Sequence, residues 1–299
     1  MPSSKWTAAD LPDLTGRTVV VTGASSGLGT ITARELARAG ARVILAVRDV
    51  AKGERVAETI TGDREVRALD LADLSSVRAF AEGWTGNLDV LINNAGIMAV
   101  PQGKTVDGFE SQFGTNHLGH FALTNLLLPH IADRVVTVSS GAHRIGKMHL
   151  DDLNWEQRKY DRWRVYGQSK LSNLLFTMEL QRRLDAAGSP VRALAAHPGY
   201  ASTHLQSHTG SRLNHVVMGI GNRVLAQSDA MGALPTLFAA TQDLPGNTFV
   251  GPDGFAEQRG HPTIVGRSKA AQNAEDARRL WERSEELTGV STPALGAPA

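Results

Sequence analysis

Short apolar runs rich in β-branched residues alternate along this chain with segments whose apolar residues recur every three or four positions. Short runs bounded by turn signals are typical of buried strands, and the wider spacing is typical of amphipathic helices. The strand-like runs are Arg17–Thr22, Arg42–Val47, Glu65–Leu69, Leu88–Ile92, Arg134–Ser139 and Val191–Ala196. The helix-like segments are Gly27–Ala39, Ala51–Ile60, Leu74–Trp84, about Val106–His130, and Trp163–Ala187.

This alternation predicts βαβ units with right-handed crossovers and a parallel sheet between two helical layers. Leu88–Ile92 is apolar almost throughout, as expected of a strand buried on both faces. No internal repeat or Gly/Ser-rich linker divides the 299 residues, a length within the range of one large α/β domain. We therefore expect a single domain over 1–299, with its core at about 15–290.

Two connections in this pattern are unusually long. They are Gly141–Arg162 and Gly199–Leu225, and loops of such length in a compact domain are usually functional or partly disordered. We expect the second to border the substrate. The Pro/Ala-rich tail Ser291–Ala299 is expected to fray.

Charge and cysteine content exclude several classes of protein. The 31 basic and 30 acidic residues nearly cancel and form no long block, so we expect no nucleic-acid partner and no anionic membrane surface. The absence of cysteine excludes disulfides, thiolate nucleophiles and Cys-based zinc sites, and it fits a reducing compartment. The polar segment Met1–Arg17 is unlike a secretory signal, and no apolar run is long enough to span a membrane. A soluble, cytoplasmic protein is expected.

A glycine-rich turn follows the first predicted strand, with the sequence Thr22-Gly-Ala-Ser-Ser-Gly-Leu-Gly29. Gly23 permits a tight turn, Gly27 permits a phosphate to approach, and Gly29 lets helix and strand lie close together. The amides of the residues between these glycines then point at a pyrophosphate, helped by the helix dipole; they belong to Ser25, Ser26 and Leu28. The alternative is an ordinary Gly/Ser turn between a strand and a helix.

A tyrosine and a lysine four positions apart, Tyr166 and Lys170, share one face of a predicted helix. A phenol has an ordinary pKa of about 10, so action as a base near pH 7 requires that the pKa fall by about three. One ammonium about 4 Å away supplies an energy of that order, and we expect Lys170 to lower the pKa of Tyr166. The alternative is a packed tyrosine with its hydroxyl in water. Tyr160 has the same spacing to Arg164 but lies in a charged stretch, and is expected at the surface.

Together with further motifs in a fixed order, these features resemble the short-chain dehydrogenase/reductase superfamily over about residues 15–290. The motifs are Thr22-Gly-x-x-x-Gly-x-Gly29, Asp70-Leu71, Asn93-Asn94-Ala95-Gly96, Asn116, Val138-Ser139-Ser140, Tyr166-x-x-x-Lys170 and His197-Pro198-Gly199. The resemblance implies a single doubly wound, Rossmann-type parallel sheet with strand order 3-2-1-4-5-6-7 and helices on both faces.

The same resemblance implies an oxidoreductase that transfers a hydride between a nicotinamide and a ketone, an aldehyde or a secondary alcohol. Tyr166 would be the acid/base, and Lys170 would also hold the nicotinamide ribose. Alternation directs Ser139 and Ser140 to opposite faces, and the family pattern selects Ser140 to polarise the substrate carbonyl. Asn116 would anchor a water linked to the lysine, although it could also satisfy a helix kink.

Further cofactor contacts are implied at the carboxyl ends of the strands. Asp70 would contact the adenine amino group, or alternatively cap the helix that begins near Leu71–Leu74. Asn93 is expected to be mainly structural and Asn94 a cofactor contact. His197-Pro198-Gly199 would line the nicotinamide side, or form an ordinary Pro-Gly turn. The remaining expected contacts are Leu71, Ala95, Gly96 and Thr203.

The end of the second strand bears on the choice of dinucleotide. In this family an acidic residue there grips the adenosine ribose of NAD, whereas here the strand ends Leu45-Ala46-Val47-Arg48. Arg48 can form a bidentate pair with a 2′-phosphate, which favours NADP(H) over NAD(H). The alternative is an exposed arginine paired with Asp49. His117 and His120 share a helix face, but no third ligand is placed by their spacing, and no metal is expected.

The long stretch between Ser140 and Tyr166, with Ser-Ser-x-Ala-His143, resembles the branch of retinol dehydrogenases and light-dependent protochlorophyllide reductases. The chain is expected to lack the membrane anchor of many retinol enzymes, and it has no cysteine like that of the photoreductases. An apolar or aromatic carbonyl or alcohol is the expected substrate class. Alternative hypotheses are a non-catalytic NADP(H)-binding regulator of the same fold, and epimerisation or dehydration. Many relatives pair through the helix that bears Tyr166, so a homodimer or homotetramer is expected.

Overall fold

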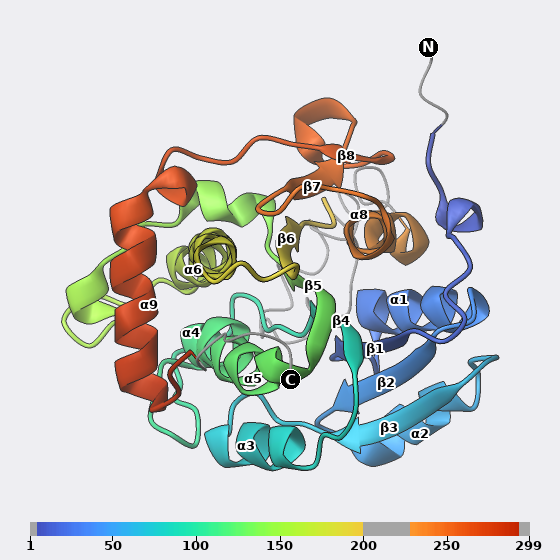
Figure 1. Cartoon of the computed structure of the whole chain (residues 1–299). Helices are drawn as coiled ribbons and strands as arrows, with labels where there is room; N and C mark the ends of the chain where they lie inside the picture. The colour runs from blue at the N-terminus through green and yellow to red at the C-terminus, as the bar shows by residue number, and fades with distance from the viewer. Residues whose placement is uncertain (1–4, 200–227, 293–299) are drawn as a thin grey trace, which may run out of the picture.

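The computed structural model describes residues 5–199 and 228–292 (Figure 1). Thr203, nearly all of the connection 199–225 and most of the tail 291–299 lie outside the described residues. Among the residues that are described, no helix is long and apolar enough to cross a membrane.

The described chain forms one eight-stranded sheet with the order β3-β2-β1-β4-β5-β6-β7-β8. Its strands are β1 (Thr18–Thr22), β2 (Arg42–Val47), β3 (Arg64–Ala68), β4 (Leu88–Asn93), β5 (Ile131–Val138), β6 (Arg192–Ala196), β7 (Phe249–Pro252) and β8 (Pro262–Ile264). The first seven are parallel and β8 pairs antiparallel with β7. The predicted order of seven strands is confirmed, and β8 extends it.

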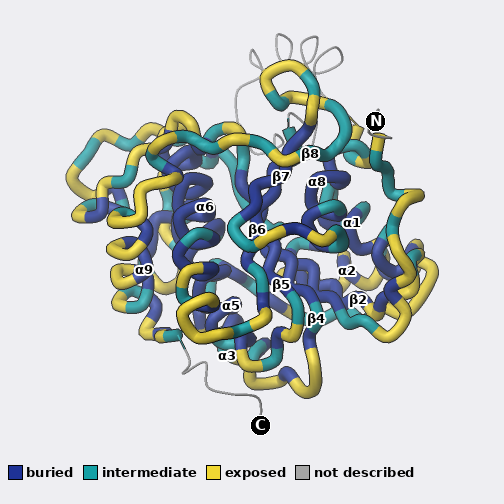
Figure 2. The backbone as a smooth tube through the Cα atoms, turned by 45° about the horizontal axis from the view of Figure 1, so that its top comes forward, coloured by how far each residue is buried: buried dark blue, intermediate teal, exposed yellow. Residues whose placement is uncertain are grey.

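Helices cover both faces of the sheet, as Figures 1 and 2 show. One layer contains α3 (Leu74–Glu82), α5 (Gly119–Leu127), α6 (Arg162–Ala186) and α9 (Ala274–Thr288). The other contains α1 (Gly27–Arg38), α2 (Val50–Ala57) and α8 (Asp229–Thr241). Strand residues alternate between the layers, so that Val20 faces the first and Val19 and Val21 face the second.

The helix predicted over about Val106–His130 begins later than expected and is irregular. It starts with the short α4 (Ser111–Phe113), because the Glu110 side chain accepts hydrogen bonds from the amides of Gln112 and Phe113. A π-turn, η2 (Gly114–Leu118), separates α4 from α5, and the 3₁₀ turn η3 (Leu128–His130) follows α5. The sequence pattern indicated the helix but neither its cap nor the π-turn, which places Asn116.

The C-terminal helix α9 is fastened to the layer that carries α5 and α6. The Trp281 ring stacks on Phe176 of α6 at 5.5 Å between centroids, and it meets Phe121 of α5 edge-on at 4.9 Å. His117 Nε2 lies 2.9 Å from the Ser284 hydroxyl of α9. This helix was not among the predicted elements, yet it buries the face of α6 around Phe176 within the chain.

Replacing Trp281 with alanine should lower the free energy of unfolding by about 3–5 kcal/mol, because a fully buried ring with two aromatic partners is removed. Arg278→Ala on the exposed face of the same helix is the matched control, and should change the free energy far less, because its ion pairs lie in solvent. Urea unfolding measures both. Equal effects of the two substitutions would contradict the assignment of α9 to the core.

Candidate active site

The glycine turn between β1 and α1 has the geometry of an anion site. Gly23 and Gly27 adopt left-handed φ values of +68° and +53°. A Cβ at Gly29 would lie 2.5 Å from the Gly23 carbonyl oxygen, so close packing of helix on strand requires glycine there. Ser26 precedes the helix without capping it through its side chain. The first amides of α1, including that of Leu28, lack intrahelical acceptors and are available to an anion.

The Thr22 hydroxyl joins the end of β1 to the turn after β4. It accepts hydrogen bonds from the amides of Asn94 and Ala95, each at 2.9 Å, and Asn94 Nδ2 donates to the Thr22 carbonyl at 2.8 Å. Asn93 is fully buried and donates to Thr124 Oγ1 at 2.8 Å. Both asparagines therefore have structural bonds, and Asn94 also lies at the strand ends where the cofactor contact is expected.

At the end of β2, Arg48 is exposed and has neither a hydrogen-bond nor an ion-pair partner within residues 5–199 and 228–292. Asp49 caps α2 instead, with Oδ1 accepting from the Lys52 amide at 2.9 Å. The alternative pairing of Arg48 with Asp49 is therefore not found in the structure, and the guanidinium is available to another anion.

Asp70 closes a turn after β3 and does not cap α3. Its Oδ1 accepts from the Ala72 amide at 2.9 Å, whereas α3 is capped by Asp73, which accepts from the Ser75 amide at 2.8 Å. The alternative of Asp70 as the helix cap is wrong, since three more residues pass before the helix begins at Leu74. Leu71, an expected cofactor contact, is buried, and a Cβ on Gly119 would lie 2.3 Å from its carbonyl oxygen.

Tyr166 and Lys170 lie on α6 beside the end of β5, as their spacing predicts. Both are nearly buried, with 7% and 4% of their surface exposed. Lys170 Nζ donates to the Val138 carbonyl at 3.0 Å and lies 5.8 Å from the centre of the Tyr166 ring. Ser139 Oγ donates to the Lys170 carbonyl at 2.8 Å, so it positions the helix. Ser140, the next residue, accepts from the Ala142 amide at 3.2 Å, and its hydrogen bond with the Tyr166 hydroxyl acts to lower the pKa of that phenol.

Burial sets the pKa values of this pair. It raises the pKa of Tyr166 to about 12, and the hydrogen bond with Ser140 opposes that rise only in part. It also lowers the pKa of Lys170 to about 8. The expected lowering of the Tyr166 pKa by Lys170 is not found in the chain alone, because desolvation of the phenolate is the larger effect. Tyr166 is thus protonated at neutral pH and suited to donate a proton.

Asn116 is held in the π-turn by its side chain. Its Oδ1 accepts from the Ile97 amide at 2.8 Å, and its Nδ2 donates to the Ile97 carbonyl at 2.9 Å and to Ser169 Oγ at 3.0 Å. A Cβ on Gly96 would lie 3.1 Å from Asn116 Oδ1 and 3.4 Å from Lys170 Nζ. The turn after β4, the π-turn and the lysine therefore converge on one place, where a Cβ would press on Asn116 Oδ1 and just reach contact with the lysine.

The turn after β6 completes the group of strand ends. Gly199 has a φ of +68°, and a Cβ there would lie 2.4 Å from the Gln258 carbonyl oxygen. Its amide donates to His197 Nδ1 at 3.3 Å, and Pro198 between them is half-buried. The conformation requires glycine for structural reasons, in addition to the expected contact with a cofactor.

The arrangement of a glycine turn, a buried Tyr-Lys pair and a serine at neighbouring strand ends agrees with a match between residues 17–214 and the family model for short chain dehydrogenase. The chain belongs to this family. Human retinol dehydrogenase 13 is 43% identical to it, over 94% of this chain and 87% of the relative. Bovine (Bos taurus) retinol dehydrogenase 12 is 49% identical, over 93% and 88%.

Solved structures show the same dehydrogenase fold. An uncharacterized protein from Mycobacterium Paratuberculosis is 60% identical with a TM-score of 0.85, covering 97% of this chain and 100% of that one. A structure from Beutenbergia cavernae with NADP bound at low occupancy is 27% identical with a TM-score of 0.59, covering 77% and 91%.

One tyrosine of this short chain dehydrogenase was assigned wrongly from the sequence. Tyr160 is half-buried, not a surface residue: its hydroxyl donates to Glu110 Oε1 at 3.1 Å and accepts from Gln112 Nε2 at 3.2 Å. Burial, with the nearby Glu110 charge, raises the pKa of Tyr160. The charged residues around it hid this role, since the partners come from a distant segment of the chain.

The long connection 141–162 is a packed part of the dehydrogenase. Trp155 is buried and its Nε1 donates at 3.0 Å to Gln168 Oε1, two residues beyond Tyr166. Gln168 Nε2 in turn donates to the Leu153 carbonyl at 3.0 Å. The Arg158 guanidinium lies 3.9 Å from the centre of the Trp155 ring. The connection therefore braces α6, the helix that carries Tyr166 and Lys170.

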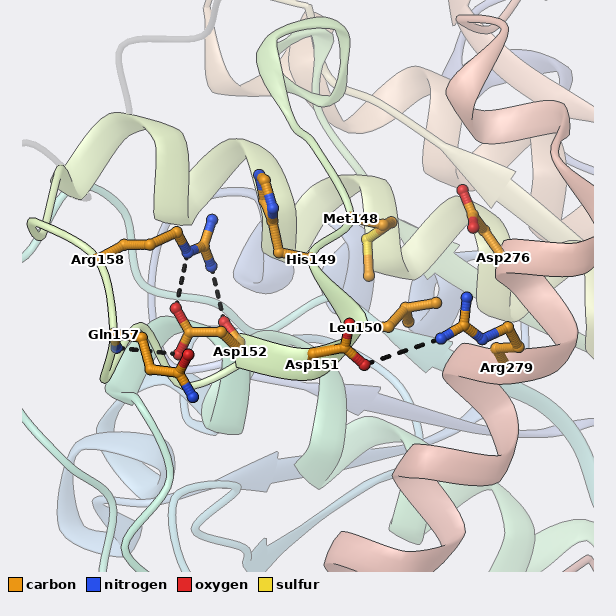
Figure 3. Close-up of a pocket in the computed structure, with 9 residues that line it drawn as sticks. All are labelled: Met148, His149, Leu150, Asp151, Asp152, Gln157, Arg158, Asp276 and Arg279. Atoms are coloured by element: carbon orange, nitrogen blue, oxygen red, sulfur yellow. Dashed lines mark hydrogen bonds and ion pairs between the residues drawn. The ribbon is translucent and has the colours of Figure 1, made fainter.

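A cavity of about 420 Å³ lies between this connection and α9 (Figure 3). Its charged groups face each other: Arg158 pairs with Asp152 at 2.7 Å, and Arg279 lies 3.8 Å from Asp151. Neither Tyr166 nor Lys170 lines it.

Two buried histidines of the π-turn region predict an acid-sensitive fold. Burial lowers the pKa of His117 to about 3 and that of His120 to about 4, from the ordinary 6.5. Their contribution to stability is therefore complete above pH 6.5 and is lost as the pH falls toward 4, by up to about 1.4 kcal/mol per pH unit for each ring. His117→Asn removes one of the two rings, so the free energy of unfolding should fall less steeply with decreasing pH, by up to about 1.4 kcal/mol per pH unit. Urea unfolding at several pH values tests this, and parallel curves for wild type and variant would contradict it.

Proposed function

We propose that this chain is an NADP(H)-dependent oxidoreductase that interconverts an apolar aldehyde or ketone and its alcohol, with Tyr166 as the acid/base. The observation that carries the proposal is the meeting of Tyr166, Ser140 and Lys170 at the end of β5, beside the glycine turn. All four residues of the expected catalytic set, Asn116 included, lie at this edge of the sheet.

The residues present suit a nicotinamide dinucleotide. The uncapped start of α1 and the left-handed glycines Gly23 and Gly27 suit a pyrophosphate. Lys170 has three N–H donors and makes one hydrogen bond within the described residues, to the Val138 carbonyl. Its remaining donors suit the ribose hydroxyls on the nicotinamide side. Asp70, Leu71, Asn94, Ala95, Gly96, Pro198 and Gly199 are proposed as further contacts.

The chemistry divides between the dinucleotide and the protein. When bound, the dinucleotide supplies the hydride for reduction or accepts it in oxidation. In reduction, the Tyr166 hydroxyl donates its proton to the carbonyl oxygen, and the Ser140 hydroxyl stabilises the negative charge that develops there. Lys170 then stabilises the phenolate until a proton from solvent restores the phenol. Because burial keeps Tyr166 protonated, the chain by itself holds the acid that reduction requires.

Arg48 supports NADP(H) as the dinucleotide. Its exposed guanidinium follows β2 without a partner in the described chain, at the strand end where the adenosine ribose is expected. A 2′-phosphate there accepts a bidentate, charge-assisted pair. The NADP-containing structure from Beutenbergia cavernae shows that a related chain binds this dinucleotide.

The relatives named retinol dehydrogenases support a substrate with a long apolar body, and we propose a retinoid-like alcohol or aldehyde. The cytoplasm is the proposed compartment, since a chain without cysteine gives no sign of an oxidising one. A homodimer or homotetramer remains the proposed assembly.

Tyr166→Phe should lower kcat for reduction of retinaldehyde with NADPH by roughly 10²–10⁴-fold, because the proton donor is lost. NADPH affinity should change little. Tyr160→Phe removes the other described phenol and is the matched control, with kcat expected near that of the wild type. Unchanged turnover in Tyr166→Phe would contradict the mechanism, and tight NADPH binding without turnover on any carbonyl would favour the non-catalytic alternative.

Arg48→Ala should weaken NADPH binding by roughly 10–100-fold, the range for a lost charge-assisted hydrogen bond, and leave NADH binding within about twofold. Arg42→Ala, at the other end of the same strand, should leave both unchanged. Fluorescence titration gives the Kd values. A similar loss for NADPH and NADH would refute the assignment of Arg48 to the phosphate.

A further inference from the structure

His120 lies between the π-turn and the glycine turn of residues 22–29, which is called the nucleotide turn below. Its side chain lies on α5 with 1% of its surface exposed, and both ring nitrogens are engaged. Nδ1 lies 3.1 Å from the main-chain carbonyl of Asn116, and Nε2 lies 2.9 Å from Thr22 Oγ1. The imidazole thus touches the turn that carries a catalytic residue and the strand end that opens the dinucleotide site.

The partners fix the tautomer of the ring. A carbonyl oxygen can only accept, so Nδ1 carries the hydrogen and Nε2 is an acceptor. The Thr22 hydroxyl accepts from the amides of Asn94 and Ala95, and it therefore turns its own hydrogen to His120, at 2.9 Å, in preference to the Ile92 carbonyl at 3.3 Å. Every polar group in this chain of hydrogen bonds is satisfied only while the ring is neutral.

The surroundings keep the ring neutral. Burial, aided by the charge of Lys170, lowers the pKa of His120 to about 4, so its Nε2 lone pair persists at neutral pH. The Asn116 carbonyl that it binds belongs to the residue whose side chain is tied to Ile97 and to Ser169, the neighbour of Lys170.

From these contacts we infer that His120 is a positioning residue. It holds the π-turn that bears Asn116 in register with Thr22, where the nucleotide turn that would receive the dinucleotide begins. This role rests on the proposed function. The neutral ring contacts Thr22, 98 positions earlier in the sequence. Through this contact, the placement of Asn116 and the shape of the nucleotide turn depend on each other.

His117 provides a matched control three positions earlier, in the π-turn itself. It is as deeply buried as His120, and burial lowers its pKa in the same way. Its ring nevertheless points to α9, with Nε2 2.9 Å from Ser284 Oγ, and has no bond to the nucleotide turn. Removing its ring removes a buried, hydrogen-bonded imidazole without touching Thr22.

The test compares His120→Leu, His120→Asn and His117→Leu in the full chain. NADPH Kd is measured by fluorescence without substrate, kcat and KM with retinaldehyde, and folding by thermal unfolding. His120→Leu should weaken NADPH binding by roughly 5–10-fold, the range of one lost buried hydrogen bond, and lower kcat. In His120→Asn the amide still donates to Asn116 but does not reach Thr22, so kcat should recover more than NADPH affinity. His117→Leu should lower the unfolding midpoint and leave the NADPH Kd within about twofold.

A double-mutant cycle tests the link itself. Adding His120→Leu to Thr22→Val should weaken NADPH binding no further than about twofold, because the hydroxyl that the ring holds is already gone. The same coupling should appear in urea unfolding without dinucleotide. If His120→Leu does not fold, His120→Asn takes its place in the cycle.

Independent, multiplicative effects in the cycle would overturn the inference, as would an equal loss of NADPH affinity in His117→Leu. Unchanged NADPH affinity in the His120 variants, with normal binding by the wild type, would overturn this inference alone. Failure of the wild type to bind NADPH or NADH would instead contradict the proposed function, and the positioning role with it.

Discussion

A buried ammonium with one described hydrogen bond, Lys170 Nζ to the Val138 carbonyl, is the interaction on which the site depends. Burial of a charge is costly unless other groups hold and solvate it, and here the end of β5 supplies the acceptor. Neighbouring residues pack closely around it: a Cβ on Gly96 would lie 3.4 Å from Nζ and 3.1 Å from Asn116 Oδ1, and Ser139 Oγ donates a hydrogen bond to the Lys170 carbonyl. Burial lowers the pKa of this ammonium to about 8, and its spare donors are the ones we propose for the ribose hydroxyls.

Parts of the chain outside the family motifs support α6, the helix that carries Lys170. The connection 141–162 grips Gln168 through Trp155, and α9 seals the outer face near Phe176 with Trp281. Two nearby histidines link this region to different parts of the structure. His117 contacts Ser284 of α9, and His120 contacts Thr22 at the start of the nucleotide turn. The helix α6 is thereby held by the connection 141–162 and by α9, as the proposed placement of Tyr166 and Lys170 requires.

Strand positions and the Tyr166–Lys170 pair were predictable because they follow local periodicity, and the structure places six predicted strands within a few residues of their expected bounds. The errors have tertiary causes. The helix expected from Val106 begins only after Glu110, whose side chain caps it. Tyr160 is half-buried because it bonds with Glu110, 50 positions away in the sequence. The pKa of Tyr166 in the chain alone is raised, whereas the spacing to Lys170 predicted a lower one. Spacing reveals the nearby charge but not the depth of burial, and burial is the larger effect. Short strands such as β8 carry too few residues to show a pattern.

The central claim, that a buried, protonated Tyr166 acts as the acid beside a charged Lys170, is tested most directly by the pH dependence of kcat/KM for carbonyl reduction with NADPH. With the pKa of Tyr166 at about 12 and that of Lys170 at about 8, the rate should be level from pH 6 to about 8 and fall above it as the ammonium is lost. A rate that rises steadily across this range would show that a deprotonated group drives the reaction, and would contradict the account.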